Sequence, residues 1–152
     1  MPSQEEDLFS RQDSLALLNE NLPLTDKLRF LHQTIRVDFP FIDRLSIALY
    51  DSKTETLKSY THSTEGGDDP VSTYEAPLSS APSLCAIIES RRPRLVQDLA
   101  IFSKGTHEHT KRIAAKGYKS SYTIPLYQSG SFVGFLFFNS LKAHPFEPIT
   151  LP

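Results

Sequence analysis

The chain of 152 residues contains one cysteine, one methionine and no tryptophan. Because Cys85 has no second thiol in the chain to pair with, an internal disulfide framework, a multi-thiolate zinc site and a two-cysteine redox centre are excluded. The sequence also lacks an excess of positive charge, since 16 Lys and Arg residues stand against 18 Asp and Glu residues. Nucleic acid is therefore disfavoured as the main partner.

Long hydrophobic runs are missing too. No apolar stretch approaches the roughly 20 residues of a membrane-spanning helix, and residues 1–7 are acidic and polar where a secretory signal is basic and then apolar. We therefore expect no membrane association and a cytoplasmic location. The length suits one domain, and we expect a flexible lead-in over 1–12, a single domain over 13–146 and a tail over 147–152.

Apolar residues at helical spacing predict four helices. The first covers residues 14–21, and the second begins at Thr25 as an N-cap and continues to Phe39, before Pro40. A third follows the cap signals Ser80 and Ser83 and ends near Ser90, and a fourth covers 106–116.

Alternation of apolar and polar residues predicts strands over 44–51, 56–62, 72–78, 95–96, 122–127 and 132–139. The segment from Phe132 to Phe138 is apolar on both faces, which is typical of a strand in the middle of a covered sheet. Helices at the start, hairpins, and short helices between strands indicate an α+β fold with a mostly antiparallel sheet of five or six strands.

The order of these elements and several short motifs resemble the GAF domain, a small-molecule sensory module of signalling proteins. The resemblance covers Leu24 to about Phe146, and the segments that carry it are Arg44–Asp51, Ser83–Pro93, Val96–Asp98, Ile124–Leu126 and Ser129–Leu136. In that family a helix ending in Glu-Ser-Gly-x-Pro leads to a strand ending in Asp, and a Pro-Leu…Gly-x-x-x-Gly hairpin closes the sheet. The resemblance implies helices on one face of the sheet and short inserted helices over the other.

Two departures from the family pattern bear on the ligand and the output. Asn139 and Phe146 fit the Asn-Lys…Phe…Asp-Glu pattern of cyclic-nucleotide-binding members, but Ser140 replaces the Lys and no Asp-Glu pair follows. Cyclic nucleotides are therefore disfavoured, and the ligand and any cofactor stay unidentified. The closing helix typical of the family is not evident, and in longer members that helix often leads to an output domain.

The ligand-binding candidates follow from the resemblance and from side-chain chemistry. In a GAF-like fold the polar face of the strand over 44–50 lines the pocket, while its apolar face packs on helices. Hydroxyl groups, one carboxylate and aromatic rings could then hold a small molecule. These candidates are Ser46, Tyr50, Ser80, Ser83, Asp98, Tyr118, Ser121, Thr123 and Phe135. For each, capping, turn formation or core packing is the competing interpretation.

Catalytic and metal chemistry find less support. His107 and His109 point about 200° apart on a helix, so they cannot clamp one metal ion. We interpret Cys85 as a small buried hydrophobe, and the residue after it is Ala86 rather than the histidine expected beside a bilin-bearing cysteine. A GAF-type methionine sulfoxide reductase needs several cysteines. Two histidines and three arginines are interpreted as exposed or half-buried surface residues: His32, His62, Arg91, Arg92 and Arg94.

The sequence thus favours a non-catalytic sensory domain of a signalling protein. Its small-molecule pocket would close through residues 64–74 and signal through the terminal helices to an output domain or partner. The alternative is a dimerisation module with a vestigial pocket, in which Leu15, Leu18 and Leu22 pair across two chains. A homodimer is expected in either case.

Overall fold

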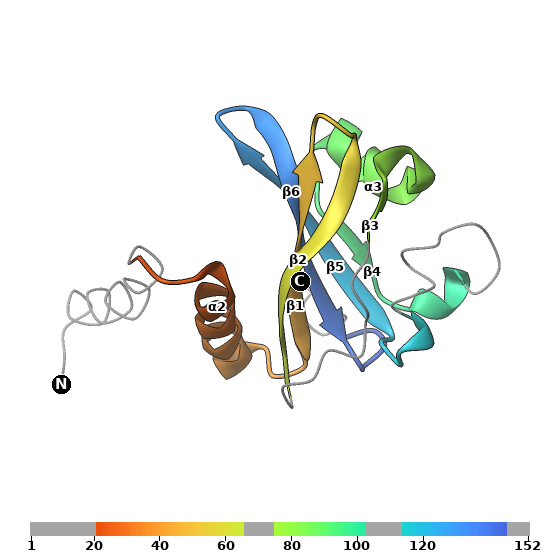
Figure 1. Ribbon diagram of the computed structural model, residues 1–152. Coiled ribbons are helices and arrows are strands. Elements are labelled where there is room, and N and C mark those ends of the chain that lie inside the picture. The colour runs from red at the N-terminus through yellow and green to blue at the C-terminus, as the bar shows by residue number, and fades with distance from the viewer. Residues whose placement is uncertain (1–20, 66–74, 103–113, 146–152) are drawn as a thin grey trace, which may run out of the picture.

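The computed structural model describes residues 21–65, 75–102 and 114–145 (Figure 1). Six antiparallel strands form one sheet in the order β3-β2-β1-β6-β5-β4. The strands are β1 (Arg44–Asp51), β2 (Thr56–Thr64), β3 (Glu75–Pro77), β4 (Arg94–Val96), β5 (Ser120–Gln128) and β6 (Ser131–Ser140). The predicted α+β class is confirmed, and so is the central place of the strand over 132–139.

Helices lie on both sides of this sheet. Figure 1 shows α2 (Leu24–Asp38) on one side and α3 (Pro82–Ser90) on the other, and the packing clusters agree. Two short 3₁₀ helices, η2 (Leu78–Ser80) and η3 (Leu99–Phe102), flank α3 and β4. The predicted helix over 14–21, the loop over 66–74, most of the helix over 106–116 and the tail over 147–152 fall outside the described residues.

The alternation in β1 assigns its side chains to two faces, as predicted. Leu45 packs with Leu28 and Ile42 under α2, on what we call the first face. Ala48 packs with Phe135 and the residues of α3, on what we call the second face. Because side chains alternate strictly along a strand, Arg44 and Ser46 share the second face with Ala48.

The close pairing of β1 and β6 depends on a glycine. Gly134 lies opposite Leu49 in the register. A Cβ atom added at Gly134 would overlap the backbone carbonyl of Ala48. Only a residue without a side chain allows this approach of the two backbones.

Both predicted helix caps are wrong, for the same reason. Thr25 lies inside the first turn of α2, and its Oγ1 is 2.7 Å from the Oγ1 of Thr61 on β2. The residue before α3 is Ala81, with no side-chain cap, and the Ser80 hydroxyl donates instead to the Pro77 carbonyl at 2.7 Å. Tertiary and local partners have taken the hydroxyl groups that a cap would use.

Candidate functional site

Polar side chains are buried at one end of the second face. Arg44 is 6% exposed and Asn139 is 0% exposed. The two residues lie opposite each other on β1 and β6, and Arg44 Nη1 donates to Asn139 Oδ1 at 3.1 Å. The same nitrogen donates to Ser46 Oγ at 2.9 Å. A guanidinium group is therefore held in place by two neutral acceptors within the sheet layer.

The amide of Asn139 is only half satisfied by the described residues. Its Oδ1 accepts from Arg44, which fixes the orientation of the amide group. Its Nδ2 is buried and has no hydrogen-bond partner among the residues that the structure describes. A buried donor left in this state costs about 1–3 kcal/mol, so this atom calls for an acceptor.

Hydroxyl groups of β5 continue the polar region. Ser121 lies opposite Asn139, and Thr123 lies opposite Phe137. Ser121 and Thr123 are 9% and 5% exposed, and Ser46 is 8% exposed. The structure thus brings three of the predicted candidates onto one face beside Arg44 and Asn139. We call Arg44, Ser46, Ser121, Thr123 and Asn139 the polar floor.

A second arginine borders the polar floor on β4. Arg94 lies opposite Thr123 in the register and is half-buried, and this burial lowers its pKa from the ordinary value. Arg91 and Arg92 are exposed. The prediction of a solvated cluster is therefore correct for those two residues and wrong for Arg94, because β4 directs its side chain to the sheet surface.

His62 borders the polar floor on β2. It lies opposite Ser46, is half-buried, and its Nδ1 is 2.9 Å from the Thr64 Oγ1. The predicted loop position for His62 is wrong, since β2 continues to Thr64.

The aromatic candidates belong to the packed core. Phe135 is 0% exposed and its ring contacts those of Phe132 and Phe137. Tyr50 contacts Phe132 and lines a hollow of about 290 Å³ beside Cys85, at the opposite end of β1 from Arg44. Tyr118 is 3% exposed in a cluster with Val96 and Leu99. For Phe135 and Tyr118, core packing is the role that these contacts describe.

The remaining candidates are dispersed. Ser80 is exposed and bonded to the Pro77 carbonyl, and Ser83 is half-buried in the first turn of α3. Asp98 accepts from the Ala100 backbone N–H at 3.0 Å and lies 3.9 Å from His144. The structure does not bring Ser80, Ser83 or Asp98 into contact with the polar floor through any of these bonds.

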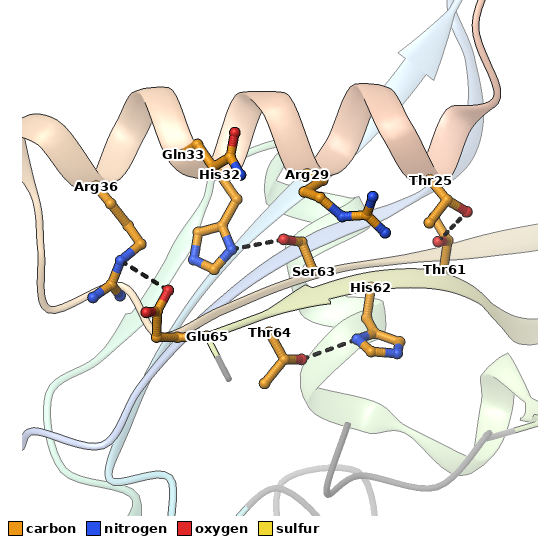
Figure 2. Close-up of a pocket in the computed structure, with 10 residues that line it drawn as sticks. All are labelled: Thr25, Arg29, His32, Gln33, Arg36, Thr61, His62, Ser63, Thr64 and Glu65. Atoms are coloured by element: carbon orange, nitrogen blue, oxygen red, sulfur yellow. Dashed lines mark hydrogen bonds and ion pairs between the residues drawn. The ribbon is translucent and has the colours of Figure 1, made fainter. Parts of the chain in front are cut away.

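A separate groove of about 340 Å³ lies between α2 and β2 (Figure 2). His32 and Ser63 point between the helix and the strand, whereas His62 and Thr64 point away from α2. His32 is 3% exposed, its Nδ1 is 2.9 Å from Ser63 Oγ, and its Nε2 is 2.8 Å from the Ile42 carbonyl oxygen. The predicted surface role of His32 is wrong, because these bonds satisfy both ring nitrogens inside the fold.

Charged groups at the end of this groove also pair with each other. Arg36 lies 3.6 Å from Asp43 and 3.5 Å from Glu65, and it donates to the Ile42 carbonyl at 2.7 Å. The groove therefore ties α2 to the sheet.

Metal and membrane features were sought over the same residues. Within the described ranges, no group of three or more His, Cys, Asp or Glu residues is placed to hold a metal ion. Within those ranges, no helix is long and apolar enough to cross a membrane.

Sequence reasoning missed Arg44 and Asn139 as site residues. Arg44 is the first residue of β1 on its polar face, and Asn139 follows an apolar run in β6. A polar residue at each end of two strands that pair was the available signal. It acquires meaning only when the register between β1 and β6 is known.

Comparisons with known proteins agree on the fold. No protein-family model matches the sequence, and no curated protein is significantly similar to it. Solved structures do match. The chromophore-binding domain of a bacteriophytochrome from R. palustris has a TM-score of 0.65 at 14% identity, over 95% of this chain and 55% of that one. The chain thus spans little more than half the length of that domain.

Two further structures cover more of their own length. The GAF domain of an Acinetobacter phosphoenolpyruvate-protein phosphotransferase has a TM-score of 0.65 at 14% identity, over 94% of this chain and 81% of that one. A free methionine-R-sulfoxide reductase from Neisseria meningitidis, solved with its substrate, has a TM-score of 0.64 at 14% identity, over 97% and 82%. The chain therefore has a GAF-like fold, as its sequence resemblance predicts.

Proposed function

We propose that this chain is a non-catalytic sensory domain that binds a small anionic molecule over the second face of its sheet. The observation that carries the proposal is the polar floor, where a buried arginine stands beside a buried amide nitrogen without a partner among the described residues. A carboxylate or phosphate oxygen would accept from Asn139 Nδ2 and from the Arg44 guanidinium.

The surroundings of Arg44 favour an anion over a neutral ligand. Hydrogen bonds that involve a charged group are stronger than neutral ones, and low solvent exposure strengthens them further. Arg94 adds a second positive group at the edge of the polar floor, and the hydroxyls of Ser121 and Thr123 add donors. The ligand class that matches these groups is a small carboxylate or phosphate.

Signalling requires that the ligand bind one arrangement of the domain more tightly than another. The polar floor lies on β1, β5 and β6, and β1 also packs against α2 through Leu45 and Leu28. A change at Arg44 would therefore reach α2 through the neighbouring residue Leu45. We expect the helices at the ends of the domain to carry the signal to an output domain or a partner, in the cytoplasm.

The non-catalytic part of the proposal rests on the state of the chain's one cysteine. Cys85 is half-buried, and its Sγ donates to the Leu78 carbonyl at 3.3 Å. It lies near Tyr50, six residues along β1 from Arg44, which is about 20 Å in an extended strand. A reductase mechanism would need thiol chemistry at the bound substrate, and Cys85 is at the wrong end of the sheet for the polar floor.

The proposal is tested with Asn139→Asp, which keeps the shape of the side chain, removes the Nδ2 donor and places a negative charge beside Arg44. Native mass spectrometry of freshly purified chain would detect a bound guest. Thermal unfolding with succinate and with inorganic phosphate probes the two anion classes. We expect either anion class to raise the unfolding temperature of the unaltered chain and to leave that of Asn139→Asp unchanged.

The control is Asn21→Asp, which makes the same change at an exposed position. It should behave as the unaltered chain does. Equal stabilisation of all three proteins, or no guest and no stabilisation by either anion, would contradict the proposed site.

A dimerisation module with a vestigial pocket is the second candidate function. The observation that favours it is the exposure of Leu22, at 40%, next to α2. Light scattering on the full chain and on a chain that starts at Pro23 separates the two, because an interaction module should lose its dimer on truncation while anion binding at the polar floor should persist.

A further inference from the structure

The two faces of the central strand β6 are covered unequally. On the second face, Phe135 and Phe137 are 0% and 3% exposed. On the first face, Leu136 and Phe138 are only half-buried, although β6 has a strand on each side. Apolar residues in the middle of a sheet are normally covered by a second layer, so the first face of β6 lacks part of its cover.

The helix α2 covers one end of the first face. Its packing cluster is centred on Leu28, Ile42 and Leu45, next to β1. Where α2 ends, an apolar hollow of about 240 Å³ remains, lined by Ile35, Phe39, Ile42, Tyr122 and Phe138. Beyond it, Leu95 of β4 is 39% exposed beside Tyr122.

These residues form one continuous apolar surface. The register aligns Leu95 with Tyr122 and Tyr122 with Phe138, and it aligns Ile124 with Leu136 in the next row on the same face. We call Leu95, Tyr122, Ile124, Leu136 and Phe138 the apolar patch. It contains no charged side chain. An exposed apolar surface of this kind marks a place where another element packs.

The sequence immediately before α2 has the matching pattern. Residues 14–21 are predicted to be helical, and Leu15 and Leu18 are three residues apart on one side of that helix. Leu22 continues the same stripe and is 40% exposed. Glu20 falls on the opposite side of the helix. The stripe is therefore apolar on the side that an uncharged surface would accept.

Chain geometry brings this segment to the apolar patch. The chain enters α2 through Pro23, which limits the connection to a short turn of the kind that joins antiparallel helices. A helix of eight residues is about 12 Å long and α2 of 15 residues is about 22 Å long. A helix folded back at the turn would therefore run beside the first half of α2, where Thr25 contacts Thr61.

That level of α2 corresponds to one row of the sheet. Thr61 lies opposite Ile47, Ile47 opposite Leu136, and Leu136 opposite Ile124. We infer that residues 14–21 form a helix antiparallel to α2 in the same chain and cover the apolar patch, with Leu15 and Leu18 against Leu136 and Ile124. This inference is independent of the anion site, which lies on the other face.

Disulfide trapping in the full chain tests the inference. In a Cys85→Ser background, Leu18→Cys is combined with Leu136→Cys, and the control pair is Leu17→Cys with Leu136→Cys. Leu17 is a neighbouring leucine on the outer side of the predicted helix. Under mild oxidation we expect the Leu18 pair to form a disulfide within one chain at least ten times faster than the Leu17 pair.

Two outcomes of the trapping would overturn the inference. Equal rates for the two pairs would mean that the segment does not dock by this stripe. A disulfide between two chains, seen as a dimer under non-reducing conditions, would mean that the apolar patch is occupied by a second copy.

Thermal unfolding provides a second readout that needs no cysteine. Leu18→Asp should lower the unfolding temperature by about 5 °C, since it removes a leucine from an apolar contact in a domain of this size. Leu17→Asp should leave the unfolding temperature within about 1 °C of the unaltered chain. Equal effects of the two changes would overturn the inference.

Discussion

Arg44 and Asn139 are 95 residues apart in sequence and directly opposite each other in the sheet, with Arg44 Nη1 donating to Asn139 Oδ1 at 3.1 Å. This pair joins the first described strand to the last one. It also defines the place where a ligand oxygen would find two buried donors.

Asn139→Asp should stabilise the ligand-free domain by about 1 kcal/mol, because it removes a buried donor that lacks a partner and adds a charge pair with Arg44. Arg44 would hold the pKa of the new carboxylate below its ordinary value. The gain should be present at neutral pH and be lost as the pH falls through that lowered pKa. Urea unfolding at pH 7 and at pH 3 would measure it, and a gain that is equal at both pH values would contradict the prediction.

Arg44→Met should destabilise the domain by about 1–3 kcal/mol, since Ser46 Oγ and Asn139 Oδ1 would both lose their donor in a buried environment. Arg29→Met is the matched control, because Arg29 is exposed and its printed ion pair with Asp26 is a surface pair at 3.6 Å. Denaturant titration should show a loss for the first variant and a change within about 0.5 kcal/mol for the second.

Gly134→Ala should destabilise the domain by about 1–3 kcal/mol, because the new methyl group would meet the Ala48 carbonyl and push β6 away from β1. Gly130→Asn is the comparison. Gly130 has φ +82° in the hairpin turn with nothing within 4 Å of an added Cβ, and asparagine tolerates that conformation. Equal unfolding midpoints for the two variants would show that β1 and β6 can separate at no cost.

Ser46→Phe should abolish anion binding, because Ser46 is 8% exposed at the centre of the polar floor and a phenyl ring would cover Arg44. Some loss of stability accompanies it, about 1–3 kcal/mol for added volume in a packed region. Ser52→Phe, in the exposed turn after β1, serves as control. Calorimetric titration with the anion that stabilises the unaltered chain would measure the effect, and unchanged affinity in Ser46→Phe would show that the ligand binds elsewhere.

His32→Leu should destabilise the domain by about 1–3 kcal/mol, since Ser63 would lose its partner and the groove between α2 and β2 would lose a buried contact. His144→Leu, at an exposed position, should have little effect. Thermal unfolding of the two variants separates a histidine that fastens α2 to the sheet from one at the surface.

The sequence predicted the parts of the fold that depend on local pattern. The alternation of Leu45, Ser46 and Ala48 assigned the faces of β1 correctly, and the double-sided apolar run of Phe132 to Phe138 identified the central strand. Periodicity is visible in one segment at a time, so these features need no knowledge of the partner.

Features that depend on pairing between distant segments were not predicted. Arg44 and Asn139 become a site only through the register of β1 with β6, which a single sequence does not specify. His32 looks like a surface residue until Ser63 is placed beneath it. Thr25 was read as a cap because its tertiary partner, Thr61, lies 36 residues away.

The place of β6 between β1 and β5 has a consequence for how the chain is made. During synthesis β1 and β2 can pair as soon as they emerge, but the inner edge of β1 stays open for about 80 residues until β6 follows. Long-range pairings of this kind slow folding, and an open strand edge invites pairing with other chains. A ribosome-bound chain that stops short of Ser131 would therefore expose the inner edge of β1 to its neighbours, and release from that hazard comes only with the last strand.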